Sequence, residues 1–213
     1  MFTGIVEGTG TVMEVAREAD VVAVRIDGGT VARGLRPGDS IAVNGCCLTA
    51  VTAARGEFTC HLTAETLSRT AFAATLFPRA RVNLERPMPA RGRFDGHIVQ
   101  GHVDGVGKVV RLTRDERAAE LVVAAPPAIL RYMVEKGSIT VDGVSLTVAA
   151  LRARAFTVAL IPYTLERTNL HAARPGTRVN LEADVIAKYV ERLMTPPPSR
   201  ARRTGARRSR NRP

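Results

Sequence analysis

The stretch SIAVNGCCLT at residues 40–49 recurs as SITVDGVSLT at residues 138–147, with six of ten positions identical. Three further pairs of segments are related by the same offset of 97 or 98 residues: MFTGIVEGTGTV with IVQGHVDGVGKV, FTCHLTAETLSRT with FTVALIPYTLERT, and the two copies of RVNLE at 81–85 and 178–182. A constant offset over four segments indicates a tandem duplication.

The duplication divides the chain into two homologous domains, which we expect at residues 1–95 and 96–182. They meet in a Pro-, Gly- and Arg-rich linker at 86–96. Residues 183–194 are expected to form a C-terminal α-helix, and residues 195–213 a disordered Arg- and Pro-rich tail.

Each repeat has the pattern of short β-strands. Apolar runs such as VVAVRI and SIAVNG contain β-branched residues and end in Gly, Asn or Asp. About six short strands in about 95 residues are typical of a small closed or Greek-key barrel, which leaves no exposed sheet edge. The sequence therefore predicts a mainly β protein of two tandem six-stranded Greek-key β-barrels. The equivalent segments 28–35 and 125–134 are expected to form short helices.

The C-terminal helix is predicted from an apolar stripe with helical spacing, made by Val185, Ile186, Tyr189, Val190, Leu193 and Met194. The first repeat has no such helix, because Pro87 and Pro89 follow its RVNLE. The stripe could pack on the chain's own barrel or join subunits, and the sequence leaves both open.

The net charge of +11 is concentrated in the tail. Residues 195–213 hold seven of the 31 basic residues and no acidic one, so 24 basic and 20 acidic residues remain elsewhere. A solvated tail is the common explanation of such a charge run. We therefore do not expect nucleic acid as a partner, since only the tail favours it.

The adjacent Cys46 and Cys47 could form a disulfide, bind a metal, pack in a core or do chemistry. Three cysteines without paired spacing argue against a disulfide, and no C-x2-C pair suggests zinc. Along a strand, neighbouring side chains point to opposite faces. The second repeat has Val144 and Ser145 at these positions, so we expect Cys46 in the core and Cys47 at a site of chemistry.

Two features bear on where the protein resides. No stretch approaches the roughly 20 consecutive apolar residues of a membrane helix. The N-terminal segment lacks the basic and apolar regions of a signal peptide. We expect a soluble, cytoplasmic protein without membrane contact.

Six segments together resemble the riboflavin synthase alpha-chain family: MFTGIVEGTG, VNGCCLT, GHIVQGHVDGVG, KGSITVDGVSLTV, PYTLERTNL and VNLEADVIAKYVERL. They occur in order, with family-like spacing, on the internal duplication that the family shares. The resemblance implies dismutation of two molecules of 6,7-dimethyl-8-ribityllumazine. One donates a four-carbon unit to the other, which gives riboflavin and 5-amino-6-ribitylamino-pyrimidinedione.

The resemblance also implies a homotrimer, with each active site between the N-terminal barrel of one subunit and the C-terminal barrel of a neighbour. It implies no metal and no organic cofactor, and an association with lumazine synthase. A pseudo-two-fold pair of sites is suited to holding two copies of one substrate in contact.

The chemistry requires removal of a proton from the 7-methyl group of one lumazine and activation of the other. His102, expected on a strand beside Gly101, could move protons near neutral pH, or be a structural histidine. Cys47 could act as a nucleophile or proton donor. Ser145, its counterpart, could bind substrate or position a water.

The resemblance adds Phe2, Lys136 and Asp184 to the catalytic candidates. Lys136 could reach an anionic intermediate or a ribityl group, or be solvent-exposed, and Asp184 could be only the N-cap of the last helix. His97 lies five residues before His102, so on a strand the two rings would point to opposite faces. This argues against a shared metal and leaves His97 a supporting candidate.

Substrate binding is expected in two matching sets of residues: Gly4, Ile5, Val6, Cys47, Leu48, Thr49, His61, Leu62, Thr63, Ala64, Glu65, Thr66, Gly101, His102, Val103, Lys136, Ser145, Leu146, Thr147, Leu160, Ile161, Pro162, Tyr163, Thr164 and Leu165. Tyr163 is a departure, because family members often have a smaller polar residue there. The alternative function is that of a non-catalytic lumazine- or flavin-binding antenna protein on the same fold. The joint presence of the catalytic candidates favours the enzyme.

Overall fold

The computed structural model describes residues 1–18, 20–115 and 118–195. The predicted tail lies, apart from Thr195, outside these residues. None of the helices in the described part of the chain is long and apolar enough to span a membrane.

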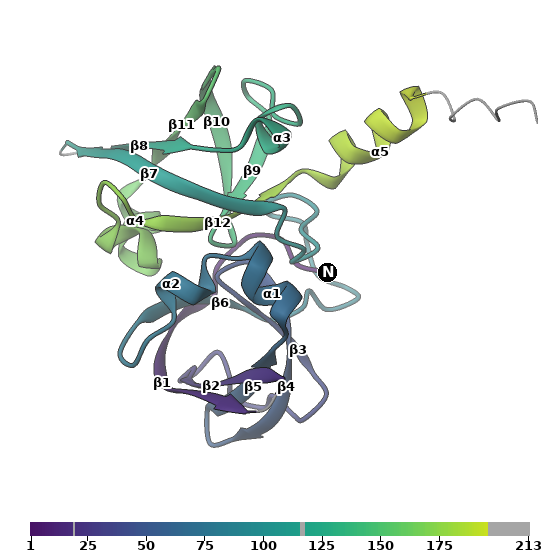
Figure 1. The fold of residues 1–213 in the computed structure, drawn as a ribbon, viewed down its shortest axis with the longest axis vertical. Coiled ribbons are helices and arrows are strands. Elements are labelled where there is room, and N and C mark those ends of the chain that lie inside the picture. Colours follow the sequence, from purple (N-terminus) through teal and green to yellow (C-terminus); the bar gives the residue numbers. More distant parts are fainter. Residues whose placement is uncertain (19, 116–117, 196–213) are drawn as a thin grey trace, which may run out of the picture.

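Two closed β-barrels of six strands each form the body of the molecule (Figure 1). The first consists of β1 (Gly8–Glu18), β2 (Val21–Asp27), β3 (Ser40–Val43), β4 (Cys46–Ala54), β5 (Glu57–Leu62) and β6 (Arg81–Glu85). The second consists of β7 (Gly105–Arg114), β8 (Ala119–Ala124), β9 (Ser138–Val141), β10 (Val144–Arg152), β11 (Ala155–Leu160) and β12 (Arg178–Ala183). In both, the strands follow the spatial order first, second, fifth, fourth, third, sixth, and all pairs are antiparallel. The predicted fold class is confirmed.

Each barrel closes around its own apolar core. Ile26, Phe58 and Leu84 are fully buried in the first, and Leu121 and Phe156 in the second. The burial pattern along the strands alternates, which places their apolar side chains inside the barrels.

The long first strand of each barrel passes close to the core at a glycine. A Cβ on Gly10 would lie 2.8 Å from Leu84 Cδ1, and one on Gly107 would lie 2.7 Å from Val123 Cγ1. A bulge follows at equivalent places, near Val12 in β1 and Val109 in β7. These bulges bend the strands so that each can pair with two neighbours.

The remaining elements are α1 (Ala64–Arg69), α2 (Phe72–Thr75), α3 (Pro127–Leu130), α4 (Pro162–Arg167), the 3-10 helix η1 (Asn169–Ala172) and α5 (Val185–Met194). The helix predicted at 125–134 is present as the short α3. The one predicted at 28–35 is wrong, since that segment forms turns. Gly29 and Gly34 have φ of 54° and 84° there, which is incompatible with a right-handed helix.

The two barrels meet through a polar network with pseudo-two-fold symmetry. Asn83 Nδ2 donates to the Asp142 carbonyl at 2.9 Å, and its counterpart Asn180 Nδ2 donates to the Asn44 carbonyl at 2.8 Å. Backbone contact between Gly45 and Gly143 is so close that a Cβ on Gly45 would lie 2.6 Å from the Gly143 nitrogen. The duplicated sequence therefore builds a duplicated interface.

Two arms lie between the barrels: the N-terminal arm, residues 2–7, and the linker arm, residues 97–104. They pair antiparallel at one point, where Phe2 N donates to the Val99 carbonyl at 2.7 Å and Val99 N donates back at 3.1 Å. Figure 1 shows the N-terminus at this junction. The linker arm is otherwise not a strand, so the expectation that His102 lies on one is wrong. Gly101, with φ of 79°, turns the chain there.

Helix α5 projects away from the second barrel (Figure 1). Val185 is buried, whereas Ile186, Tyr189 and Leu193 have exposed fractions of 56%, 65% and 84%. Lys188 forms an ion pair with Asp104 at 2.6 Å at the base of the helix. Most of the apolar stripe is therefore not packed on the chain's own barrel.

Candidate active site

Each arm contacts the barrel formed by the other repeat, at the place where a candidate site lies. The Gly101 carbonyl accepts a hydrogen bond from Cys47 N of the first barrel at 2.8 Å. The Gly4 carbonyl accepts one from Ser145 N of the second barrel at 2.7 Å. Val103 packs against the first core and Val6 against the second. Because each arm reaches the barrel of the other repeat, there are two equivalent half-sites, one at Cys47 and one at Ser145.

The cysteine pair separates as the strand geometry predicts. Cys46 lies in the first core, and burial raises the pKa of its thiol to about 12. Cys47 is half-buried on the other face of β4 and packs against Phe2, Ala42 and Val99 beneath the linker arm. All three cysteines are free thiols. Cys47 is therefore the most exposed of the three thiols, and it lies at a half-site.

Among the described residues, the Ser145 side chain has a hydrogen-bond partner and the Cys47 side chain has none. His97 Nδ1 lies 2.7 Å from Ser145 Oγ, and His97 Nε2 is buried without a hydrogen-bond partner among the described residues. Burial lowers the pKa of the His97 imidazole, while the charge of Asp184 acts in the opposite direction. A neutral imidazole at neutral pH is able to accept the hydroxyl proton. The structure thus gives His97 a direct contact that its position in the sequence does not predict.

The two histidines of the linker arm lie at different candidate half-sites. His97 contacts Ser145, whereas His102 follows Gly101, which packs so tightly on Cys47 that a Cβ would lie 2.6 Å from Cys47 Cβ. His102 is exposed and follows the residue that covers Cys47. The prediction that the rings of His97 and His102 point to opposite faces of a strand is wrong, because this segment is not a strand.

The other catalytic candidates occupy three different environments. Phe2 is fully buried, so its side chain anchors the N-terminal arm and does not line an open surface. Lys136 is exposed in the turn before β9, with φ of 67°. Asp184 caps α5 by accepting a hydrogen bond from Ile186 N at 3.0 Å, and it also lies within electrostatic range of His97. The capping role considered for Asp184 is thus realised.

The expected binding residues fall into three classes by exposure. The exposed ones are Ile5, Thr49, His61, Thr63, Ala64, Glu65, His102, Lys136, Thr147, Ile161, Pro162 and Tyr163. The half-buried ones are Val6, Cys47, Thr66, Val103, Ser145, Thr164 and Leu165. The buried ones are Gly4, Leu48, Leu62, Gly101, Leu146 and Leu160. The four buried leucines belong to the barrel cores, so only their backbone groups are available to a ligand.

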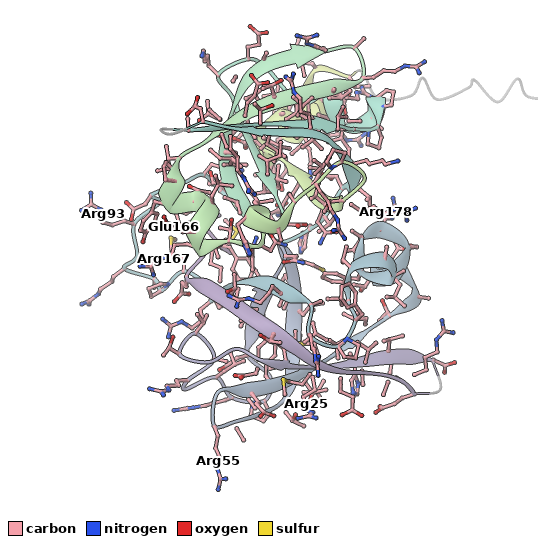
Figure 2. The ribbon with its side chains drawn as sticks, turned by 90° about the vertical axis from the view of Figure 1, so that its left-hand side faces the viewer. Arg25, Arg55, Arg93, Glu166, Arg167 and Arg178 are labelled. Carbon is pink, nitrogen blue, oxygen red and sulfur yellow. The ribbon has the colours of Figure 1, made fainter. Side chains whose placement is uncertain are left out.

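The half-sites differ at equivalent helices. On α1, Glu65 forms an ion pair with Arg69 at 2.8 Å. On α4, the Arg167 guanidinium lies over the Tyr163 ring, 5.2 Å from its centre. Figure 2 shows Arg167 and Arg178 where the barrels meet, with Arg55 at the far end of the first barrel. Tyr163 thus makes a cation–π contact with Arg167 at the place where Glu65 of the first repeat forms an ion pair with Arg69.

A cavity of about 440 Å³ opens beside the N-terminal arm. Thr3, Ile5 and Glu85 line it together with the linker segment 86–95. This places Ile5, one of the expected contacts, at an accessible surface.

Comparison with known proteins agrees with the duplication. The family model for the lumazine binding domain matches twice, at residues 3–87 and 100–184. Riboflavin synthase of Mycobacterium bovis is 52% identical over 200 residues, covering 91% of this chain and 98% of the relative. Riboflavin synthase of Actinobacillus pleuropneumoniae is 41% identical over 199 residues, covering 93% and 92%.

A solved structure has the same fold. The crystal structure of LumP complexed with riboflavin has a TM-score of 0.80 at 24% identity, and the match covers 86% of this chain and 99% of that one. On the strength of the two domain matches and of the identity to its relatives over nearly their full length, this chain belongs to the riboflavin synthase family.

Proposed function

We propose that this chain is a riboflavin synthase. It converts two molecules of 6,7-dimethyl-8-ribityllumazine into riboflavin and 5-amino-6-ribitylamino-pyrimidinedione by transfer of a four-carbon unit, without metal or organic cofactor. The observation that carries the proposal is the pair of equivalent half-sites with unlike reactive groups, Cys47 in one and Ser145 with His97 in the other. Two like pockets suit two copies of one substrate, and unlike groups suit a donor and an acceptor.

The reaction needs a base for the 7-methyl group of one lumazine and a nucleophile or water for the other. His97 in its neutral form can take the Ser145 hydroxyl proton, so that Ser145 positions a water or attacks the ring. Cys47 and the exposed His102 supply a thiol and an imidazole at the other half-site. Lys136 is the candidate cation for an anionic intermediate, and Asp184 acts through His97.

The test is direct: the purified chain is incubated with 6,7-dimethyl-8-ribityllumazine, and riboflavin is followed by absorbance and fluorescence. Cys47→Ser and Ser145→Ala are expected to lower kcat by about 100-fold, within the usual range for loss of an acid–base or nucleophilic group, with little change in lumazine binding. Tight binding of lumazine without turnover by the wild type would instead support the antenna protein. Full rates in both variants would contradict the assigned roles.

We further propose a homotrimer in which the N-terminal barrel of one subunit faces the C-terminal barrel of a neighbour. The exposed apolar stripe of α5 supports it, because a stripe of this kind on a projecting helix is a suitable subunit contact. A cytoplasmic location is proposed on the three free thiols, which suit a reducing compartment. An association with lumazine synthase rests on the family resemblance and is tested by co-sedimentation of the two purified proteins.

A further inference from the structure

Two buried glutamates occupy equivalent places, one at the end of β6 and the other one residue before the end of β12. Glu85 is 5% exposed and Glu182 is 3% exposed. Both are the last residue of the repeated RVNLE. A carboxylate is costly to bury, so its retention in both barrels needs a reason.

Each carboxylate accepts hydrogen bonds from the backbone of one arm. Glu85 Oε1 accepts from Thr3 N at 2.6 Å and from Thr3 Oγ1 at 2.8 Å, and its Oε2 accepts from Gly4 N at 3.0 Å. Glu182 accepts from Gln100 N at 2.8 Å and from Gly101 N at 2.9 Å. Two adjacent N–H donors are therefore bound by the two oxygens of one side chain in each case. At pH 8, above the pKa of about 7 to which burial raises the Glu182 carboxyl, the ionised side chain offers acceptors for both donors, whereas an amide offers only one acceptor atom.

The same arm residues contact the reactive strands on their other side. The Gly101 carbonyl binds Cys47 N, and the Gly4 carbonyl binds Ser145 N. A continuous hydrogen-bonded path thus runs from Glu182 through Gly101 to Cys47, and another from Glu85 through Gly4 to Ser145. Both glycines have left-handed φ, 76° and 79°, which lets the backbone approach the strand this closely.

We propose that Glu85 and Glu182 are positioning residues, each of which holds an arm against the reactive residue of the opposite half-site. Glu182 holds the linker arm over Cys47, and Glu85 holds the N-terminal arm on Ser145. The catalytic consequence rests on the proposed function, but the position of the arm over Cys47 can be measured without substrate.

The test uses the reactivity of Cys47 with a thiol reagent such as 5,5′-dithiobis(2-nitrobenzoate). Burial raises the pKa of Cys46 and of Cys60 to about 12, so both react slowly, and Cys47→Ser gives their background. Glu182→Gln keeps the size of the side chain but loses one acceptor. It is expected to raise the rate of Cys47 modification about tenfold, the factor expected for loss of one hydrogen bond to a charged group.

Glu85→Gln provides the matched comparison, because it loosens the arm of the other half-site. Because Phe2 of that arm also packs on Cys47, Glu85→Gln is expected to raise the Cys47 rate by less than Glu182→Gln does. Glu57→Gln, which changes a half-buried acid of the first barrel paired with Arg25, is expected to leave the rate unchanged. Equal acceleration by Glu85→Gln and Glu182→Gln would indicate general loosening and overturn the proposal. Unchanged rates in both would overturn it too.

A second variant at Glu182 and a parallel turnover assay complete the test. Should Glu182→Gln not fold, Glu182→Asp keeps the charge with a shorter reach, and a faster Cys47 rate than in the wild type is again expected. Turnover is measured in parallel, where both Gln variants should lower kcat more than they raise KM. If the wild type shows no turnover while the thiol rates differ as expected, the proposed function fails and the positioning role stands.

Discussion

At the residue scale, equivalent positions of the two repeats hold different side chains with different roles. The CC pair is divided by strand geometry, and that division is predictable from the sequence, since Val144 and Ser145 stand at the same places. The contact between His97 and Ser145 is not predictable, because it depends on where the linker arm crosses. Glu85 and Glu182 have a signal in the sequence, an acid retained at the end of both copies of RVNLE.

Asp142 is a second residue whose role depends on burial. Its Oδ1 accepts from Asn180 N and its Oδ2 from Asn169 Nδ2, both neutral groups. Burial raises its pKa to about 7 from 3.8. The folded state therefore holds this proton more tightly than the unfolded chain, so the resulting stability is present below pH 3.8 and is lost as pH rises through about 7.

We predict that the free energy of unfolding falls between pH 4 and pH 8 by an amount on the order of a few kcal/mol from this group. Asp142→Asn, which copies Asn44 of the first repeat, should reduce that slope. Part of the pH dependence should remain in the variant, because burial also raises the pKa of Glu182 to about 7. Urea unfolding of both proteins at several pH values measures the difference. Identical slopes would show that Asp142 is not protonated in the folded state.

At the element scale, the barrels are predictable and the arms are not. Strands follow from short local apolar runs with β-branched residues, whereas an arm with one isolated bridge is held by contacts to a barrel distant in sequence. The segment 28–35 shows the same limit, because its glycines favour turns where its equivalent forms α3. The division of the domains at residue 95 stays a prediction.

The close approach of the linker arm predicts a large effect of a small substitution. Gly101→Ala places a methyl group 2.6 Å from Cys47 Cβ at a φ of 79°. We expect a loss of stability of about 2–3 kcal/mol, from backbone strain and overpacking together, and a loss of turnover. Gly34→Ala is the control, with φ of 84° but nothing within 4 Å of the added Cβ, so it reports strain alone. Equal thermal denaturation midpoints in the two variants would refute the close approach.

At the scale of the whole molecule, the pseudo-two-fold interface joins the barrels within one chain, and α5 remains exposed. The sequence leaves open whether its stripe packs within the chain or between chains, and the structure excludes the first for most of the stripe. The duplication thus encodes the pairing of the two barrels within the chain, and the proposed trimer relies on one helix that is not duplicated.

The proposed trimer predicts different effects for two neighbouring residues of α5. Leu193→Gln removes the most exposed apolar side chain of the stripe, whereas Arg192→Gln changes its exposed neighbour. We expect light scattering to show three chains of 22.9 kDa for the wild type and for Arg192→Gln, and weakened association for Leu193→Gln. A wild-type monomer at working concentration would contradict the trimer.

The central claim is that two half-sites of one protein act on two copies of one substrate. The most direct measurement is the stoichiometry of the reaction, with lumazine consumed and riboflavin formed quantified together by chromatography. One riboflavin and one ribitylamino-pyrimidinedione are expected for every two lumazine molecules consumed. Lumazine that stays bound and unconverted, or riboflavin formed at any other ratio, would contradict it.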